Sequence, residues 1–314
     1  MRLLSFVIPC YRSEHTIDAV VEELQATLPT REGFDYEIIL VSDASPDNVF
    51  GRIRALAQNN PKIKGLKFSK NFGQHAAILA GFRIAQGEMV IVLDDDGQVP
   101  ADELYKLVDK IDEGYDVVFA KYDQKQHSKF RNWGSRVNLY MMEQLVGKPR
   151  GLVANSYMAL RRFVVDEMIR YQNAYPYLAG LIFRTSINAS DVLVHHRARR
   201  QGASGYTVRK LLALWLNGFT AFSVKPLRIG TYAGALTALI GFLYGLYIIG
   251  VKLFHPGMQA GYASLMAVML FVGGLILLLL GLIGEYVGRI YICLNQSPQY
   301  VIKESVNVDG LPKP

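Results

Sequence analysis

The sequence predicts an α/β fold with a mostly parallel sheet, followed by a two-helix membrane hairpin. From residue 1 to about 120, short apolar runs typical of buried strands alternate with amphipathic helical patterns, as in doubly wound sheets. Two uncharged apolar runs, each long enough to span a bilayer, follow after residue 228. Three consecutive aspartates, Asp94–Asp96, end one of the predicted buried strands.

The predicted elements of the first part follow one another in strand–helix order. Ser13 is the expected N-cap of the first helix, and Pro9 is expected to end the first strand. Strands are expected at Leu4–Ile8, Tyr36–Val41, Lys64–Ser69, Met89–Leu93 and Asp116–Ala120. Helices are expected near Thr16–Leu24, Asn48–Gln58, Gln74–Gln86 and Asp102–Glu113. The pattern of residues 151–195 does not indicate an order of elements.

The second part of the chain indicates a membrane. After a basic loop, a helix is expected around Trp133–Leu145, and residues 207–223 are typical of an interfacial amphipathic helix. Ile229–Val251 and Ala263–Ile283 are each expected to span, with basic residues flanking their outer ends. The positive-inside rule then places both termini in the cytoplasm. The alternative, a buried core hairpin in a soluble protein, is disfavoured by the length of the runs.

These features divide the chain into four expected parts: a cytoplasmic α/β domain (1–206), an interfacial helix region (207–228), two transmembrane helices (229–292) and a cytoplasmic tail (293–314). The formal net charge is +7, but residues 192–284 contain eight basic residues and no acidic one. The remainder, with 26 basic and 27 acidic residues, is nearly neutral. This distribution favours anionic lipid over nucleic acid as a partner. Two distant cysteines, Cys10 and Cys293, indicate reduced thiols.

The aspartate run Asp94–Asp96 is the main candidate for chemistry. Carboxylates at the carboxyl end of a parallel strand lie where open α/β sheets bind ligands, and hard oxygen ligands suit a divalent cation that holds a diphosphate. Adjacent carboxylates also repel one another unless a cation offsets them. The alternative is a solvated turn. Asp43 follows the second strand at the same edge, either as a hydrogen-bond acceptor for a nucleobase or as a turn residue.

Four segments together resemble family 2 glycosyltransferases with the GT-A fold: Val7–Tyr11, Val41–Ser45, Asn71–Gly81 and Asp94–Gln98. The later segment Gly284–Tyr291 is similar to the polyprenyl-phosphate branch of that family. This branch includes dolichyl-phosphate mannose synthase, bactoprenol glucosyltransferases and the transferase that places 4-deoxy-4-formamido-arabinose on undecaprenyl phosphate. The resemblance implies a Rossmann-like GT-A domain, a Mg²⁺ or Mn²⁺ cofactor and an inverting sugar transfer.

The resemblance also implies roles for individual residues. Metal binding is implied for Asp94, Asp96 and Gln98, and binding of the donor nucleotide-sugar for Pro9, Tyr11, Glu14, Asp43, Asp95 and Arg199. The acceptor phosphate is assigned to Lys121, Arg131 and Ser135. The chain departs from the family at residues 155–158, at Ala179 and at Gly205, so the sugar contacts of those positions cannot be carried over.

The resulting prediction is a transferase in the bacterial inner membrane that moves a sugar from a nucleotide donor, UDP favoured over GDP, to undecaprenyl phosphate. The resemblance implies a homo-oligomer, with a tetramer as one option. A processive polysaccharide synthase is disfavoured because no Gln-x-x-Arg-Trp element is present. A non-catalytic sugar-nucleotide-binding partner of a flippase is disfavoured because Asp94, Asp96 and Arg131 are intact.

Overall fold

The structure is a computed structural model, and it describes residues 1–122, 143, 147–174, 176–195, 197, 225–254, 261–295 and 297–309. The chain divides into two compact units. The first consists of Met1–Leu211 together with Ser297–Pro314, and the second is Leu212–Gln296. The predicted helix around Trp133–Leu145 and the amphipathic segment 207–223 lie outside the described residues, apart from the single residue Glu143.

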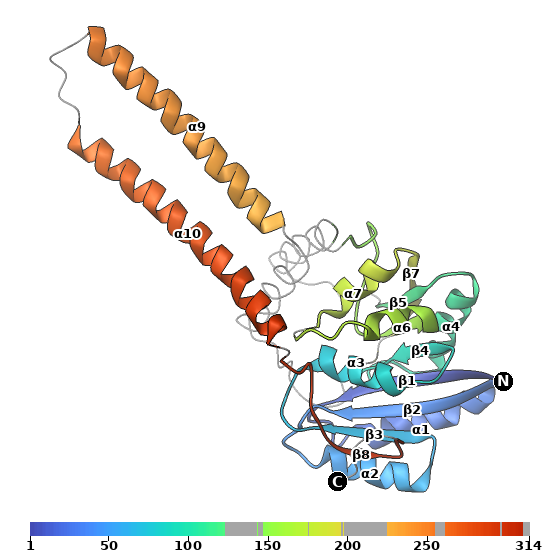
Figure 1. Cartoon of the computed structure of the whole chain (residues 1–314). Coiled ribbons are helices and arrows are strands. Elements are labelled where there is room, and N and C mark those ends of the chain that lie inside the picture. The colour runs from blue at the N-terminus through green and yellow to red at the C-terminus, as the bar shows by residue number, and fades with distance from the viewer. Residues whose placement is uncertain are drawn as a thin grey trace. The chain divides into compact units, whose positions relative to one another are not determined.

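The first unit is built on one eight-stranded mixed sheet (Figure 1). Its order is β7-β5-β6-β4-β1-β2-β3-β8. All pairs are parallel except those that β6 makes with β4 and β5, and the one that β8 makes with β3. The strands are β1 (Arg2–Cys10), β2 (Phe34–Ser42), β3 (Ile63–Phe68), β4 (Met89–Val92), β5 (Val117–Tyr122), β6 (Met158–Arg161), β7 (Ala189–Val194) and β8 (Ile302–Val306). The predicted doubly wound, mostly parallel sheet is confirmed.

Helices cover both faces of this sheet. The helices of the first unit are α1 (Ile17–Thr27), α2 (Val49–Asn59), α3 (Gln74–Ile84), α4 (Leu104–Asp112), α6 (Arg162–Ile169) and α7 (Leu178–Thr185), with short 3₁₀ turns η1 (Leu28–Thr30) and η2 (Ala101–Glu103). Leu4, Phe6 and Ile8 of β1 share one buried core with α1, α2 and α4. The next side chain, Val7, faces α3, since neighbouring strand residues point to opposite faces.

The contact between α3 and β1 depends on a glycine. A Cβ atom added to Gly81 would lie 2.4 Å from Cγ1 of Val7, well inside van der Waals contact. The missing side chain therefore lets the helix approach the central strand closely. This matters for the site because the first residue of α3, Gln74, lies at the carboxyl edge of the sheet.

Several local predictions need correction. Pro9 does not end β1, which continues to Cys10, because Pro9 still pairs with Val41 in the parallel ladder. Ser13 is not the N-cap of α1; Thr16 occupies that position, and the carbonyl of Ser13 accepts hydrogen bonds from the amides of Thr16 and Ile17 instead. The region 151–195, which has no clear sequence pattern, forms β6, α6, α7 and β7.

The residues after the hairpin return to the sheet. Instead of remaining a simple tail, they add β8 as an antiparallel edge strand beside β3. The ring of Tyr300 stacks on Phe68 with centroids 5.1 Å apart, and the side chain of Asn307 donates hydrogen bonds to the carbonyls of Ala57 and Ile63. Strand β8 therefore covers an edge that would otherwise expose unpaired backbone groups.

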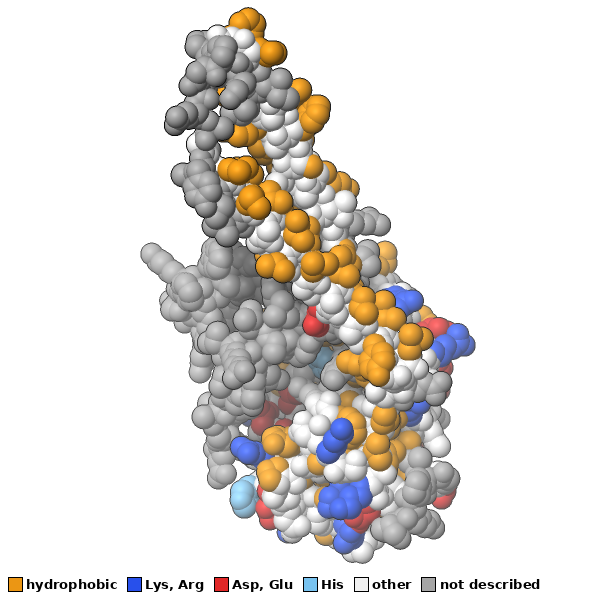
Figure 2. Space-filling view, turned by 60° about the vertical axis from the view of Figure 1, so that its left-hand side comes forward, with side chains coloured by type: hydrophobic (Ala, Val, Ile, Leu, Met, Phe, Trp, Pro, Cys, Tyr) orange, Lys and Arg blue, Asp and Glu red, His pale blue; other side chains and the backbone are white. Residues whose placement is uncertain are grey.

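The second unit contains the two long helices α9 (Lys225–Phe254) and α10 (Tyr262–Leu294). Its large apolar side chains are exposed, as Figure 2 shows along the helices; Phe271 is 65% and Leu277 is 71% exposed. Within the described residues one stretch, Phe271–Leu294, is long and apolar enough to cross a membrane, judged by length and composition alone. The helical hairpin is thus confirmed, whereas a crossing by Ile229–Val251 is not supported by that criterion and stays a prediction.

Candidate active site

The aspartate run lies at the switch point of the sheet, where β1 pairs with β2 on one side and with β4 on the other. Asp95 bridges the two strand ends, because its Oδ2 accepts a hydrogen bond from the amide of Tyr11 at 2.9 Å. Its carbonyl accepts another from the hydroxyl of Thr16 at 2.7 Å. Burial raises the pKa of Asp95 to about 6, and the charges of Asp94 and Asp96 act in the same direction. Asp95 therefore holds the ends of β1 and β4 together.

Among the described residues, two side chains from different elements donate hydrogen bonds to Asp94. Its Oδ1 accepts a hydrogen bond from Nε2 of Gln74 at 3.1 Å. Its Oδ2 accepts one from Oγ of Ser156 at 2.6 Å. Gln74 is the first residue of α3, and Ser156 lies just before β6. Both oxygens of the carboxylate are thus oriented by neutral donors.

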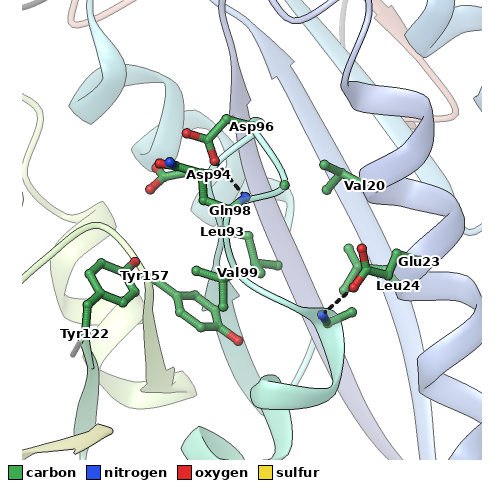
Figure 3. Close-up of a pocket in the computed structure, with 12 residues that line it drawn as sticks. Val20, Glu23, Leu24, Leu93, Asp94, Asp96, Gln98, Val99, Tyr122 and Tyr157 are labelled. Carbon is green, nitrogen blue, oxygen red and sulfur yellow. Dashed lines mark hydrogen bonds between the residues drawn. The ribbon is translucent and has the colours of Figure 1, made fainter. Parts of the chain in front are cut away.

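Asp94 and Asp96 line one cavity of about 100 Å³ (Figure 3). The amide of Gln98 donates to Oδ1 of Asp96 at 3.1 Å, so the chain turns tightly after the aspartates. Figure 3 places Val20, Glu23 and Leu24 of α1 on one side of the cavity and two tyrosines, Tyr122 and Tyr157, on the other. The cavity thus combines carboxylates at its rim with an apolar interior.

The two tyrosines are not among the predicted site residues. Burial, together with the charges of Asp94 and Asp96, raises the pKa of Tyr122 above its usual value, so its phenol stays neutral. Tyr157 is 1% exposed, and its hydroxyl has no hydrogen-bond partner among the described residues. The departure of residues 155–158 from the family pattern was the only sequence signal that pointed to this position.

Asp43 is almost fully buried, with 4% of its surface exposed. Its two carboxylate oxygens accept hydrogen bonds from the amides of Phe72 and Gly73, at 2.7 and 2.8 Å. Gly73 has φ 92°, a left-handed conformation that favours glycine, and the next residue is Gln74. Burial raises the pKa of Asp43 despite these two hydrogen bonds. In the structure Asp43 shapes the turn that delivers Gln74 to Asp94; a contact with a nucleoside stays a prediction.

The other residues predicted to bind the donor lie at the same edge. Tyr11 is 45% exposed, and the guanidinium of Arg12 lies 5.6 Å from the centre of its ring. Oε2 of Glu14 accepts a hydrogen bond from the amide of Asn48 at 3.0 Å, next to the start of α2. Pro9 is buried within β1. The structure therefore places the ring of Tyr11 in the open, whereas Glu14 and Pro9 support neighbouring backbone.

The predicted acceptor residues are only partly described. Nζ of Lys121, near the end of β5, lies 3.7 Å from Oδ1 of Asp191. Arg131, Ser135 and Arg199 lie outside the described residues.

Arg197 was not predicted, yet it docks the segment after β7 against the aspartate turn. Its amide donates to the carbonyl of Gln98 at 2.7 Å, and its Nη1 lies 2.9 Å from Oε1 of Glu23. Arg197 therefore lies beside the turn that follows the aspartates.

Two carboxylates and an amide, Asp94, Asp96 and Gln98, line the cavity with oxygen donors that suit Mg²⁺ or Mn²⁺. Across the described part of the chain, no three His, Cys, Asp or Glu side chains converge on one point. Mg²⁺ is commonly held by one or two carboxylates together with substrate phosphates, instead of by an all-protein cage. The residues present therefore fit a cation that binds together with a diphosphate.

Comparison with known proteins identifies both parts of the chain. A model of glycosyl transferase family 2 matches residues 5–169. A second family model, described as the GtrB C-terminal hairpin, matches residues 225–290. The two matches correspond to the sheet-containing unit and to the helical hairpin.

Curated relatives align over nearly the whole chain. The chain is 32% identical over 308 residues to an uncharacterised glycosyltransferase, YkcC, of Bacillus subtilis (strain 168), covering 98% of this chain and 95% of the relative. It is 33% identical over 315 residues to undecaprenyl-phosphate 4-deoxy-4-formamido-L-arabinose transferase of Yersinia pestis (strain Pestoides F), with the same coverage.

A solved structure supports the fold. Glucosyl-3-phosphoglycerate synthase from Mycobacterium tuberculosis, in complex with Mn²⁺, UDP-glucose and phosphoglyceric acid, matches with a TM-score of 0.50 at 18% identity. The match covers 68% of this chain and 76% of that one. At this identity the likeness extends to the fold alone.

Proposed function

Because the chain belongs to glycosyl transferase family 2, we propose that it transfers a sugar from a nucleotide-sugar donor to a polyprenyl phosphate at the membrane surface. One observation carries the proposal. Asp94 and Asp96 line a single cavity at the switch point of the sheet, and the same chain carries a hairpin with exposed apolar side chains. The first feature suits a nucleoside diphosphate from water, and the second suits an acceptor from lipid.

The reaction asks little of the protein as an acid or a base. A phosphomonoester has its second pKa near 6, so an acceptor oxygen is already largely anionic at neutral pH. That oxygen attacks the anomeric carbon, the bond from this carbon to the diphosphate oxygen breaks, and the bonding electrons leave with the nucleoside diphosphate. A single displacement of this kind inverts the configuration. The protein's task is to hold two anions together and to stabilise the departing charge.

Within this proposal, Asp94, Asp96 and Gln98 would hold Mg²⁺ or Mn²⁺, which would offset the charge of the diphosphate. The exposed ring of Tyr11 would lie against the nucleoside. Arg131, Ser135 and Lys121 would bind the acceptor phosphate. UDP is the favoured nucleotide, as in the prediction from the sequence; the structural neighbour was also crystallised with UDP-glucose, but its likeness extends to the fold alone.

For the hairpin we propose that both helices cross the bacterial inner membrane, with the catalytic unit and both termini in the cytoplasm. The support is the match to a hairpin family and the basic residues that flank the apolar runs. A cysteine introduced at Gln259 should then react with an impermeant reagent from outside, and one at Ser69 should not. Labelling from outside at Asp123 would contradict this topology.

The function is tested with the full-length protein, UDP- and GDP-sugars, undecaprenyl phosphate and Mg²⁺ or Mn²⁺, with the lipid product identified by mass spectrometry. We expect a lipid that carries one sugar, formed only when donor, acceptor and cation are all present. NMR of the product should show an inverted anomeric centre. A growing polysaccharide would instead indicate a processive synthase, and donor binding without any product would indicate a non-catalytic partner.

A further inference from the structure

We propose that Gln74 and Ser156 are positioning residues that orient the Asp94 carboxylate and thereby set the affinity of the site for a divalent cation. The inference deepens the proposed function and rests on it. It concerns two positions outside the aspartate run, one at the start of α3 and one just before β6.

The first support is the geometry of the two hydrogen bonds. The hydroxyl of Ser156 donates to Oδ2 of Asp94 at 2.6 Å, and the amide of Gln74 donates to Oδ1 at 3.1 Å. With one donor on each oxygen, the carboxylate is restrained against rotation about its own axis. A carboxylate oxygen carries two lone pairs, so an oxygen that accepts one hydrogen bond can in general also coordinate a cation.

The second support is the charge of the donors. A hydroxyl and an amide are neutral, so these two bonds orient the carboxylate without neutralising it. Residues that hydrogen-bond to a metal-ligating carboxylate commonly fix its direction, and their loss typically weakens metal binding 10- to 100-fold. Ser156 and Gln74 have the chemistry that this role requires.

The third support is that the fold places both donors independently. In the antiparallel pair of β4 and β6, Val92 lies opposite Met158. Continuing this register by two residues brings Asp94 opposite Ser156. Gln74 comes from a different element and directly follows a turn. The amides of Phe72 and Gly73 in this turn donate hydrogen bonds to Asp43. Two separate elements therefore converge on the same carboxylate.

A purely structural role is the alternative, in which Ser156 merely ties β4 to the start of β6. The chain offers a matched control for it. The hydroxyl of Ser186 donates a hydrogen bond to Oδ2 of Asp116 at 2.7 Å. Asp116 lies at the amino ends of the strands, directly before β5. This bond has the same chemistry, almost the same length and similar partial burial. It lies away from the cavity that Asp94 and Asp96 line.

The test measures Mn²⁺ binding to the full-length protein, with and without UDP, by electron paramagnetic resonance of the free ion. Ser156→Ala and Gln74→Met should each weaken Mn²⁺ binding about tenfold or more. Ser156→Thr, which keeps the hydroxyl, should restore most of the affinity, and Ser186→Ala should leave it unchanged. UDP binding in excess chelator should be equal in all variants. Thermal unfolding in chelator should show similar small losses for Ser156→Ala and Ser186→Ala.

The inference is overturned if Ser156→Ala and Gln74→Met bind Mn²⁺ as the wild type does, or lose no more affinity than Ser186→Ala. It is also overturned if the wild type binds no Mn²⁺ either alone or with UDP. The failure of the proposed function looks different: no lipid-linked sugar is then formed, while the Mn²⁺ affinities still separate these variants. Normal turnover with equal Mn²⁺ affinities would refute the positioning role alone.

Discussion

Carboxylates at the two ends of the sheet, buried or partly buried, are held in different ways. Toward the amino ends of the strands, Glu37 accepts hydrogen bonds from the hydroxyl of Ser5 and the amide of Gln86, each at 2.5 Å, and forms an ion pair with Nζ of Lys64 at 2.6 Å. At the carboxyl ends, Asp43 accepts hydrogen bonds from two backbone amides, and Asp95 accepts one from the amide of Tyr11.

The difference lies in the charge of the partners. The positive charge of Lys64 balances the negative charge of Glu37, so this cluster has no net charge. Backbone amides orient Asp43 and Asp95 but leave their negative charge in place, and burial raises the pKa of both groups. A charge held in this way is costly, and either protonation or a nearby cation would offset the cost. We infer that the amino-end cluster serves stability and that the carboxyl-end cluster serves binding.

The largest effect is expected from a substitution that breaks the amino-end cluster. Lys64→Met removes the cation and leaves the Glu37 carboxylate buried, which should lower the free energy of unfolding by about 3 kcal/mol. Lys62→Met is the control, because the ion pair of Lys62 with Asp35 is roughly half exposed and should contribute less than about 1 kcal/mol. Denaturant unfolding measures both. Equal losses, or a Lys64→Met protein that is folded but inactive, would contradict the division of roles.

The next effect concerns the carboxyl end. Asp96→Ala should reduce formation of the lipid-linked sugar by at least about 100-fold, because the proposed cation that offsets the diphosphate would lose a ligand. Its unfolding midpoint in chelator should stay within about 2 °C of the wild type. Asp102→Ala, an exposed acidic residue shortly after the same turn, should remain active. Retained activity of Asp96→Ala, or activity in excess chelator, would argue against a metal at this site.

A smaller effect separates the two substrates. Arg131→Ala should remove the proposed charge-assisted contact to the acceptor phosphate, so the apparent KM for polyprenyl phosphate should rise about tenfold, with little change for the nucleotide-sugar. Steady-state kinetics with either substrate varied measures this. Lys125→Ala, in the same basic stretch of the sequence, is the control. Equal and small effects of both substitutions would mean that Arg131 belongs only to a basic surface near anionic lipid.

The smallest effect is a change in pH dependence. Burial lowers the pKa of His75, whose Nδ1 lies 3.1 Å from the carbonyl of Pro176 and must donate to it. Below pH about 6.5 the unfolded chain binds a proton there that the folded chain does not, so stability is lost as the pH falls. His75→Asn keeps a donor but does not titrate. The wild type should therefore lose stability relative to this variant between pH 7 and 5; a constant difference would contradict the argument.

Patterns among neighbouring residues in the sequence were sufficient to predict much of the fold. The buried run Met89–Leu93 followed by three aspartates predicted a strand that ends in carboxylates, and β4 with Asp94–Asp96 at its end lies at the switch point, whereas the ligand that they bind stays a prediction. The alternation of strands and helices likewise predicted the sheet, since both periodicities are carried by neighbouring residues. The apolar runs predicted the hairpin in the same way, as length and composition are local properties.

Other features depended on contacts between distant residues. Ser156 lies opposite Asp94 only because β6 runs antiparallel to β4 in one particular register. The carboxylate of Asp43 is turned toward the amides of Phe72 and Gly73, a choice that its own neighbours in sequence do not reveal. Residues 302–306 become a strand because the edge of β3 offers unpaired backbone groups. Strand identity and apolar length are encoded locally, whereas register and hydrogen-bond partners are decided by which elements the folded sheet brings together.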